Sequence, residues 1–199
     1  MIASEREKLL KRESEYLSIG ITENGVPYMS IGIPWVATAH AYNMRTPNVY
    51  ISPDDLQDEE VMSLIGRFKV IGCYIWTSLT DYGFLSRFKE LQDINIKNGD
   101  AVRDLEFLSE LHECRMLYLR NAKLKDLDVI VKVKKNSKTS FGAFRCICLN
   151  NCEVEDLSIF ETEKVHFSEF LVWKPKGSNE RERWNVVSAG TRRYVEFDE

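Results

Sequence analysis

The chain has few residues whose types and spacing could support catalysis. Its three histidines are His40, His112 and His166, and none of them lies in a motif that supplies a catalytic partner. The sequence contains no Gly-rich phosphate loop, no Gly-x-Ser-x-Gly elbow and no His-Glu-x-x-His pair. His40 lies in a stretch of small residues at 37–42, which makes it the one histidine around which an enzymatic site could form. The sequence therefore favours a protein that is not an enzyme and has no catalytic residues.

The five cysteines indicate packing rather than metal or disulfide chemistry. Cys73 and Cys114 occupy apolar positions of strand-like segments, and Cys152 occupies a small position after an asparagine, so we expect three buried thiols. Cys146 and Cys148 alternate onto the other face of their strand, and a Cys-x-Cys pair is a weak zinc signal. An odd number of cysteines without paired spacing is a poor disulfide framework. We expect five reduced thiols, no metal and no cofactor.

One phrase occurs twice in the sequence, at 114–127 and at 144–157. Both copies read apolar-x-x-apolar-x-apolar-x-Asn-small-x-apolar-x-Asp-Leu. A copy at 91–105 shares the first half and reaches its Asp-Leu two residues later, and weaker copies begin near 70 and 167. The five units are spaced by 21, 23, 30 and 23 residues. The pattern predicts one structural unit repeated along the chain.

The apolar positions within each unit predict a strand with one buried face. Positions four and six are apolar in every unit, which is the period-two spacing of a strand with one buried face. Because a lone strand cannot bury that face, we expect the strands to stack as a parallel sheet. Asn98, Asn121 and Asn151 follow the strands, where a side-chain amide can bond the backbone at the bend. The expected buried row is Ile94, Ile96, Leu117, Leu119, Ile147, Leu149, Phe170 and Val172.

This order of apolar positions, with Asn or Cys near the turn and this repeat spacing, resembles the leucine-rich repeat. The resemblance covers residues 68–173 and is specific for the units at 114 and 144. It implies an α/β fold, a leucine-rich-repeat-like solenoid with a short parallel sheet. It also implies a non-catalytic module that binds another protein with the concave face of that sheet. The chain departs from the family pattern by an insertion at 132–142 and by the missing Asn of the unit at 70.

Side chains at positions three, five and seven of the units are expected to point away from the core, onto the concave face. A solvated sheet face is normally rich in Thr, Lys, Glu and Ser. This face instead carries aromatic, Met, Leu and Arg side chains, and its aromatic, Met and Arg types are enriched at protein–protein interfaces. The alternative is that the terminal segments cover Trp76 and Trp173 as ordinary core. The candidate partner-binding residues are Tyr74, Trp76, Met116, Tyr118, Arg120, Leu171 and Trp173.

The segments on either side of the repeats at 68–174 are expected to cap them, within one structural unit. Residues 1–67 form the N-terminal capping segment, with a helix expected at 3–16 and strands at 28–33 and 49–51. A second helix is expected to begin with Ser52 as N-cap and Pro53 at its first position. Residues 175–199 form the C-terminal cap, in which β-type runs at 184–187 and 193–197 predict a β hairpin.

Charge and hydropathy exclude several partner classes. The 27 basic and 31 acidic residues give a net charge of −4, which offers no electropositive stripe for nucleic acid. No apolar run approaches the length of a membrane span. Residues 1–11 also lack the apolar core of a signal peptide. We therefore expect a cytoplasmic protein that binds neither nucleic acid nor membrane.

Three functions remain open from the sequence. The leading one is a module that binds another protein, because of the repeat and its aromatic face. The second is a dedicated inhibitor or immunity-type protein, which would occlude one partner with the same face. The third is a small enzyme with its site in the N-terminal segment near His40.

Overall fold

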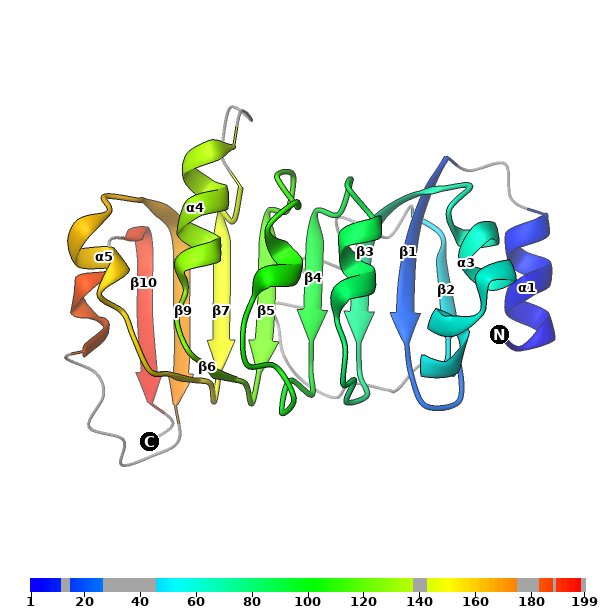
Figure 1. Ribbon diagram of the computed structural model, residues 1–199, viewed down its shortest axis with the longest axis horizontal. Coiled ribbons are helices and arrows are strands. Elements are labelled where there is room, and N and C mark those ends of the chain that lie inside the picture. Colours follow the sequence, from blue (N-terminus) through cyan, green and yellow to red (C-terminus); the bar gives the residue numbers. More distant parts are fainter. Residues whose placement is uncertain (12–14, 27–45, 138–142, 175–182, 188, 198–199) are drawn as a thin grey trace.

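The computed structural model is an α/β protein with one parallel sheet as its largest element (Figure 1). It describes residues 1–11, 15–26, 46–137, 143–174, 183–187 and 189–197. Within them, eight strands form the sheet: β1 (Tyr16–Ile21), β2 (Asn48–Ile51), β3 (Lys69–Ile75), β4 (Asp93–Ile96), β5 (Met116–Arg120), β7 (Cys146–Asn150), β9 (Phe167–Lys174) and β10 (Ala189–Phe197). Their order is β10-β9-β7-β5-β4-β3-β1-β2, and each neighbouring pair is parallel.

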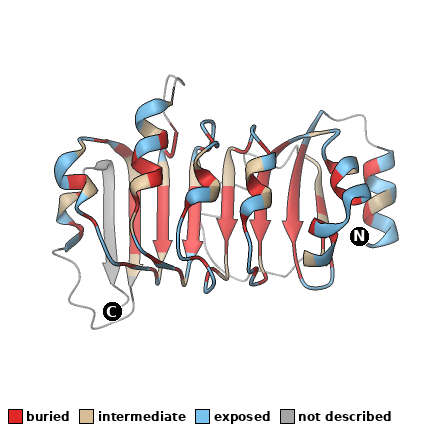
Figure 2. Cartoon of the chain, in the orientation of Figure 1, coloured by how far each residue is buried: buried red, intermediate tan, exposed pale blue. Residues whose placement is uncertain are grey.

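The helical segments of the described chain lie in front of this sheet or at its ends in the view of Figure 1. The main hydrophobic core lies between them and the sheet, whose coloured strands are largely red in Figure 2, whereas the helices combine buried and exposed residues. None of the helices in the described segments combines the length and the apolar character needed to cross a membrane. They are α1 (Ala3–Leu10), η1 (Pro53–Gln57), α3 (Glu59–Ile65), η2 (Gly83–Arg87), η3 (Glu106–Leu108), α4 (Asp128–Asn136), α5 (Ile159–Thr162) and η4 (Arg183–Val186).

The predicted buried row is confirmed. Position-four residues pair directly with one another on neighbouring strands, and so do position-six residues, so two apolar lines cross the sheet. Every side chain in them is at most 3% exposed. The first line is Ile94, Leu117, Ile147 and Phe170, and the second is Ile96, Leu119, Leu149 and Val172.

The phrase that occurs twice in the sequence folds the same way both times. Strand β5 pairs with β7 in the main sheet, and β6 (Lys123–Leu124) pairs with β8 (Glu153–Val154) in a small second ladder with the same residue offset. Asp126 and Asp156 then each accept a hydrogen bond from the backbone N–H two residues later, at 3.1 and 2.7 Å. These aspartate turns lead into α4 and α5, which lie on the helical side of the sheet (Figure 1).

The N-terminal segment agrees with the sequence prediction only in part. Helix α1 ends at Leu10 rather than near residue 16, and the unpredicted strand β1 follows. Leu17, Ile19 and Ile21 of β1 are fully buried, so its alternation is that of the repeat strands. The strand predicted at 49–51 is confirmed as β2. The strand predicted at 28–33 and His40 lie outside the described residues.

The helix predicted after Ser52 begins as expected but is interrupted. The Ser52 backbone N–H and hydroxyl donate to the Asp55 carboxylate at 2.7 and 2.8 Å, and Pro53 begins η1. Asp58 then accepts hydrogen bonds from two backbone N–H groups of the next turn, so it acts as the N-cap of a separate helix, α3. A second cap in the sequence therefore divides one predicted helix into two.

The predicted C-terminal hairpin is wrong. Residues of the first predicted run form η4, whose Trp184 is buried with its ring 5.9 Å from that of Phe170. Strand β10 pairs with β9 in parallel, which requires a crossover rather than a tight turn. The C-terminal segment thus adds one more parallel strand, and strands from all three predicted segments lie in one sheet.

Replacing Leu119 by alanine should test the packing of these lines. We expect a loss of about 2–5 kcal/mol in the free energy of unfolding, from lost burial and an unfilled cavity. Denaturant titration of Leu119→Ala measures it, with Lys125→Ala at an exposed position as the control. A loss below about 1 kcal/mol for Leu119→Ala would contradict the observed register.

Candidate functional site

The face of the sheet opposite the helical segments, here the outer face, carries the residues that the sequence singled out. Position five forms one continuous line across five strands, because its members pair directly. We call this line row five: Tyr74, Asn95, Tyr118, Cys148 and Leu171. Its members are between 1% and 7% exposed. The expectation that position five is an accessible contact surface is therefore wrong, because these side chains pack as a second buried layer.

Part of this second layer is a hydrophobic cluster separate from the main core. Tyr118, Cys148 and Leu171 form it, and Trp173 packs against it. The Lys97 ammonium nitrogen lies 5.6 Å from the centre of the Tyr118 ring, a cation–π distance. The alternation of the strands placed these residues on the outer face, but the alternation does not say whether that face is covered.

At the carboxyl ends of the strands, the residues of the outer face are more accessible than those of row five. They form row seven: Trp76, Lys97, Arg120, Asn150 and Trp173. Arg120 is exposed and the others are half-buried. Arg120 pairs with Asn150, which pairs with Trp173, while Trp76 and Lys97 directly follow the paired residues Ile75 and Ile96. Met116, at position three, is half-buried near the amino end of β5.

Of the seven predicted partner-binding residues, four therefore keep accessible surface and three do not. Trp76, Met116, Arg120 and Trp173 are accessible, whereas Tyr74, Tyr118 and Leu171 are buried. Their role in binding stays a prediction. Lys97 is not among the seven predicted residues, although its register alone places it between Trp76 and Arg120.

A glycine supports the aromatic end of row seven. The rings of Tyr50 and Trp76 lie with centres 6.1 Å apart, and the Tyr74 ring lies 6.0 Å from that of Trp76. A Cβ atom at Gly20 would lie 2.6 Å from the Tyr50 ring and 2.7 Å from the Trp76 ring. Only glycine leaves room for both rings at this position of β1, so the indole is held firmly in place.

Asparagines hold the chain where it leaves row seven. The Asn98 amide donates to the backbone carbonyl oxygen of Trp76 at 2.6 Å, which confirms the predicted backbone role for this residue. The Asn151 amide instead donates to the side-chain oxygen of Asn121 at 2.9 Å. Asn121 and Asn151 have positive φ angles of 62° and 50°, a conformation that Asn tolerates better than most residues. The carboxyl ends of the strands are thus fixed by side-chain hydrogen bonds.

Several buried polar atoms of the outer face have no hydrogen-bond partner. Within the described structure they are Ser18 Oγ, Asn48 Oδ1, Trp76 Nε1, Asn95 Oδ1 and the Tyr118 hydroxyl. Ser18 and Asn48 pair with each other across β1 and β2, and Ser18 also pairs with Gly72, so both lie on the same face as Tyr74. An unsatisfied buried group costs about 1–3 kcal/mol. Such a concentration on one face calls for a physical explanation.

Burial shifts the pKa values of two neighbouring residues near the middle of the outer face, Lys97 and Tyr118. Burial and the neighbouring Arg120 lower the pKa of Lys97. Burial raises the pKa of Tyr118 to about 12, with a smaller contribution from Cys148. An interaction with the Asn150 amide lowers that pKa, although its geometry falls short of a hydrogen bond. The Tyr118 hydroxyl therefore stays protonated at neutral pH and can donate.

The cysteines of this region are protected thiols. Burial, followed by Glu169, raises the pKa of Cys146 to about 12, and burial also raises the pKa of Cys148. Cys73, Cys114 and Cys152 are buried, as predicted, and all five cysteines are free thiols. A search of the described residues finds no group of three or more His, Cys, Asp or Glu side chains placed to hold a metal ion.

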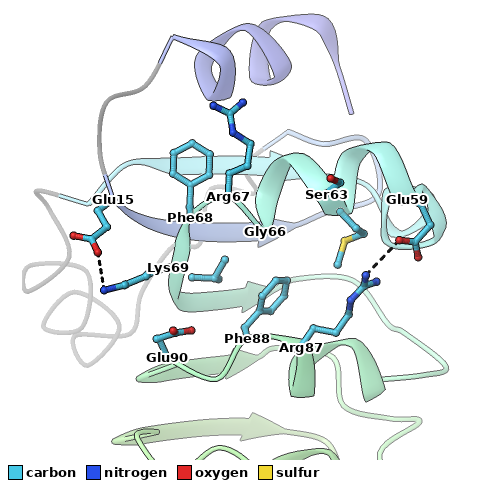
Figure 3. Close-up of a pocket in the computed structure, with 12 residues that line it drawn as sticks. Glu15, Glu59, Ser63, Gly66, Arg67, Phe68, Lys69, Arg87, Phe88 and Glu90 are labelled. Atoms are coloured by element: carbon cyan, nitrogen blue, oxygen red, sulfur yellow. Dashed lines mark hydrogen bonds and ion pairs between the residues drawn. The ribbon is translucent and has the colours of Figure 1, made fainter.

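A separate cleft of about 680 Å³ lies between α3, η2 and the start of β3 (Figure 3). Lys69 and Glu15 form an ion pair at 2.6 Å on one side, and Arg87 and Glu59 form another at 3.4 Å on the other. Small-molecule sites are lined mainly by apolar groups, whereas charged side chains dominate here. Because most of these charges already have partners in the chain, this cleft is the weaker candidate.

No catalytic arrangement is formed by the described histidines. His112 and His166 are both exposed, and no described side chain makes an ion pair or hydrogen bond with either imidazole.

A comparison of the chain with protein-family models, with curated proteins and with solved structures finds no match in any of the three.

The raised pKa of Tyr118 predicts a pH dependence of stability. The unfolded chain releases this proton near pH 10.0 and the folded chain only near pH 12, so stability is fully present below pH 10 and falls as the pH rises toward 12. The Tyr118 contribution to that fall should be about 2–3 kcal/mol. Between pH 10 and pH 12, the free energy of unfolding should fall by about 2–3 kcal/mol less in Tyr118→Phe than in the original protein. Urea unfolding at both pH values measures this difference. Equal losses in both proteins would show that the hydroxyl is not buried.

Metal analysis offers a second check on the cysteines. Because the thiols are explained by packing and have raised pKa values, we expect no stoichiometric zinc in the purified protein. Elemental analysis measures this directly. One zinc per chain, lost on Cys146→Ser, would overturn the packing interpretation of this pair.

Proposed function

We propose that the protein is a non-catalytic module that binds another protein, built as a leucine-rich-repeat-like solenoid. Support for the solenoid comes from the repeated phrase, from parallel strands that follow one another at its spacing, and from the helical segments gathered in front of the sheet. Support for the binding face comes from the outer face, where row seven leaves Arg120 exposed and two indoles half-buried. The five free thiols fit the reducing conditions of the cytoplasm.

The observation that carries this proposal is the set of unpartnered polar atoms on the outer face. Trp76 Nε1 and the Tyr118 hydroxyl are donors without acceptors, and Asn95 Oδ1 is an acceptor without a donor. Filling those positions with apolar groups would remove the cost, so stability alone does not explain them. A protein partner can offer backbone and side-chain groups of both kinds, and binding would recover these hydrogen bonds if the buried side chains rotate toward the partner.

A paired substitution tests the proposal without disturbing the packing. Tyr118 is buried, so its replacement by alanine would damage the fold, whereas Tyr118→Phe removes only the unpartnered hydroxyl. Combined with Arg120→Gln, it removes one hydroxyl and one guanidinium from the outer face. We expect this double variant to be at least as stable as the original protein and to bind a host partner about tenfold or more weakly.

Affinity capture from host lysate with quantitative mass spectrometry identifies the partner, and titration of the purified partner measures both affinities. The control is Arg115→Gln, which removes one guanidinium from an exposed position elsewhere on the chain. Unchanged affinity in the Tyr118 and Arg120 variant would contradict the proposal, as would an equal loss in the control.

A further inference from the structure

Two adjacent cations at the centre of row seven suggest what the partner presents. Ile96 and Leu119 are the last paired residues of β4 and β5, so Lys97 and Arg120 follow side by side. Neighbouring strands are about 4.8 Å apart, and like charges at that separation repel each other. Burial lowers the pKa of Lys97, and the neighbouring Arg120 lowers it further.

Neither cation is neutralised within the described structure. Some surface cations have carboxylate partners, such as Lys135 with Glu163 at 2.5 Å, but no described carboxylate forms an ion pair with Lys97 or Arg120. The carboxylates that do occur in the units of this face are Asp93 and Glu169, at position three. Four residues of strand separate positions three and seven, or about 13 Å. Row seven is thus a positive strip on a chain whose net charge is −4.

Hydrogen-bond donors dominate around this strip. The Lys97 ammonium and the Arg120 guanidinium can only donate, and the buried Trp76 Nε1 donates only and has no acceptor. The Tyr118 hydroxyl lies two residues before Arg120 on the same face and also has no partner. Asn95 Oδ1 is an unpartnered acceptor on the same face, but the donors outnumber it. These donors are complementary to the oxygens of an anion, and an Arg fork matches a carboxylate in particular.

The length of the strip favours a chain segment over a small anion. Row seven crosses five neighbouring strands from Trp76 to Trp173. Four intervals of about 4.8 Å span about 19 Å, which equals about six residues of extended peptide. The half-buried indoles at its two ends offer apolar contact to the same segment.

We propose that row seven binds an acidic segment of the partner protein, with Asp or Glu carboxylates on Lys97 and Arg120 and apolar side chains on Trp76 and Trp173. This inference rests on the proposed function and adds the chemistry of the partner to it.

Fluorescence anisotropy with labelled peptides tests the inference. The probe is a pool of octapeptides with glutamate at alternate positions and apolar or small residues between them. The comparison pool carries glutamine in place of each glutamate. We expect the full-length protein to bind the glutamate pool about tenfold or more tightly than the glutamine pool. Raising NaCl from about 50 to about 500 mM should weaken this binding, because the cations are partly solvated.

Two double variants separate this strip from general charge. Lys97→Gln with Arg120→Gln should weaken binding of the glutamate pool about tenfold or more. Arg115→Gln with Lys125→Gln removes the same two charges from exposed positions elsewhere and should change it less than about twofold. Equal binding of both pools, no binding of either, or equal effects of the two variants would overturn the inference. Tighter binding of a thymidine octanucleotide than of the glutamate pool would also overturn it, in favour of nucleic acid.

The two proposals fail in different ways. If host-partner capture depends on Tyr118 and Arg120 while the peptide pools bind alike, the acidic specificity is wrong and the protein-binding function stands. If capture is also unaffected by these residues, both proposals are wrong.

Discussion

Each strand of this chain can bury its apolar side only by lying beside the next strand in one fixed register. The sheet depends on this constraint, because a slip of one residue would turn Leu117 and Leu119 out and Tyr118 into the main core. The direct pairing of positions four and six across four neighbouring strands satisfies the constraint, and the aspartate turns return a helix over the same side. Once positions four and six face the core, alternation places positions three, five and seven on the outer face.

The residues that alternation places on the outer face are unusual for a sheet surface. Its side chains were free to be small and polar, yet row five is a buried layer with aromatic and thiol groups, and row seven ends in two indoles. The absence of a side chain at Gly20 leaves room for the Tyr50 and Trp76 rings to pack together. Polar atoms buried among these groups lack partners, and two cations lie next to each other without a carboxylate. Packing therefore explains how the side chains of this face are arranged, whereas its unpaired polar groups are consistent with binding another protein.

Sequence reasoning succeeded where a pattern is local and repeated. The two copies of the phrase predicted the buried lines and the side of the sheet for Tyr118 and Arg120, because alternation determines both. It failed where distant segments decide the outcome. A β-type run does not specify whether its neighbour is parallel, so 193–197 suggested a hairpin although it joins β9 in parallel. Strand β1 was not predicted, because the charged residues before it favour a helix. Composition predicted one continuous helix after Ser52, whereas Asp58 caps a second, separate helix. Burial of row five could not be predicted, because alternation gives a face and not its cover.

The most direct test of the central claim is an NMR titration of the tryptophan indole N–H signals with the purified partner. Trp76 and Trp173 lie in row seven, whereas Trp184 is buried in the main core beside Phe170. Single Trp→Phe variants assign each signal. If the outer face binds the partner, the Trp76 and Trp173 signals shift and the Trp184 signal stays in place, and the Trp76 signal moves downfield as its unpartnered N–H gains an acceptor. Saturated binding with the Trp76 and Trp173 signals unmoved would contradict the account.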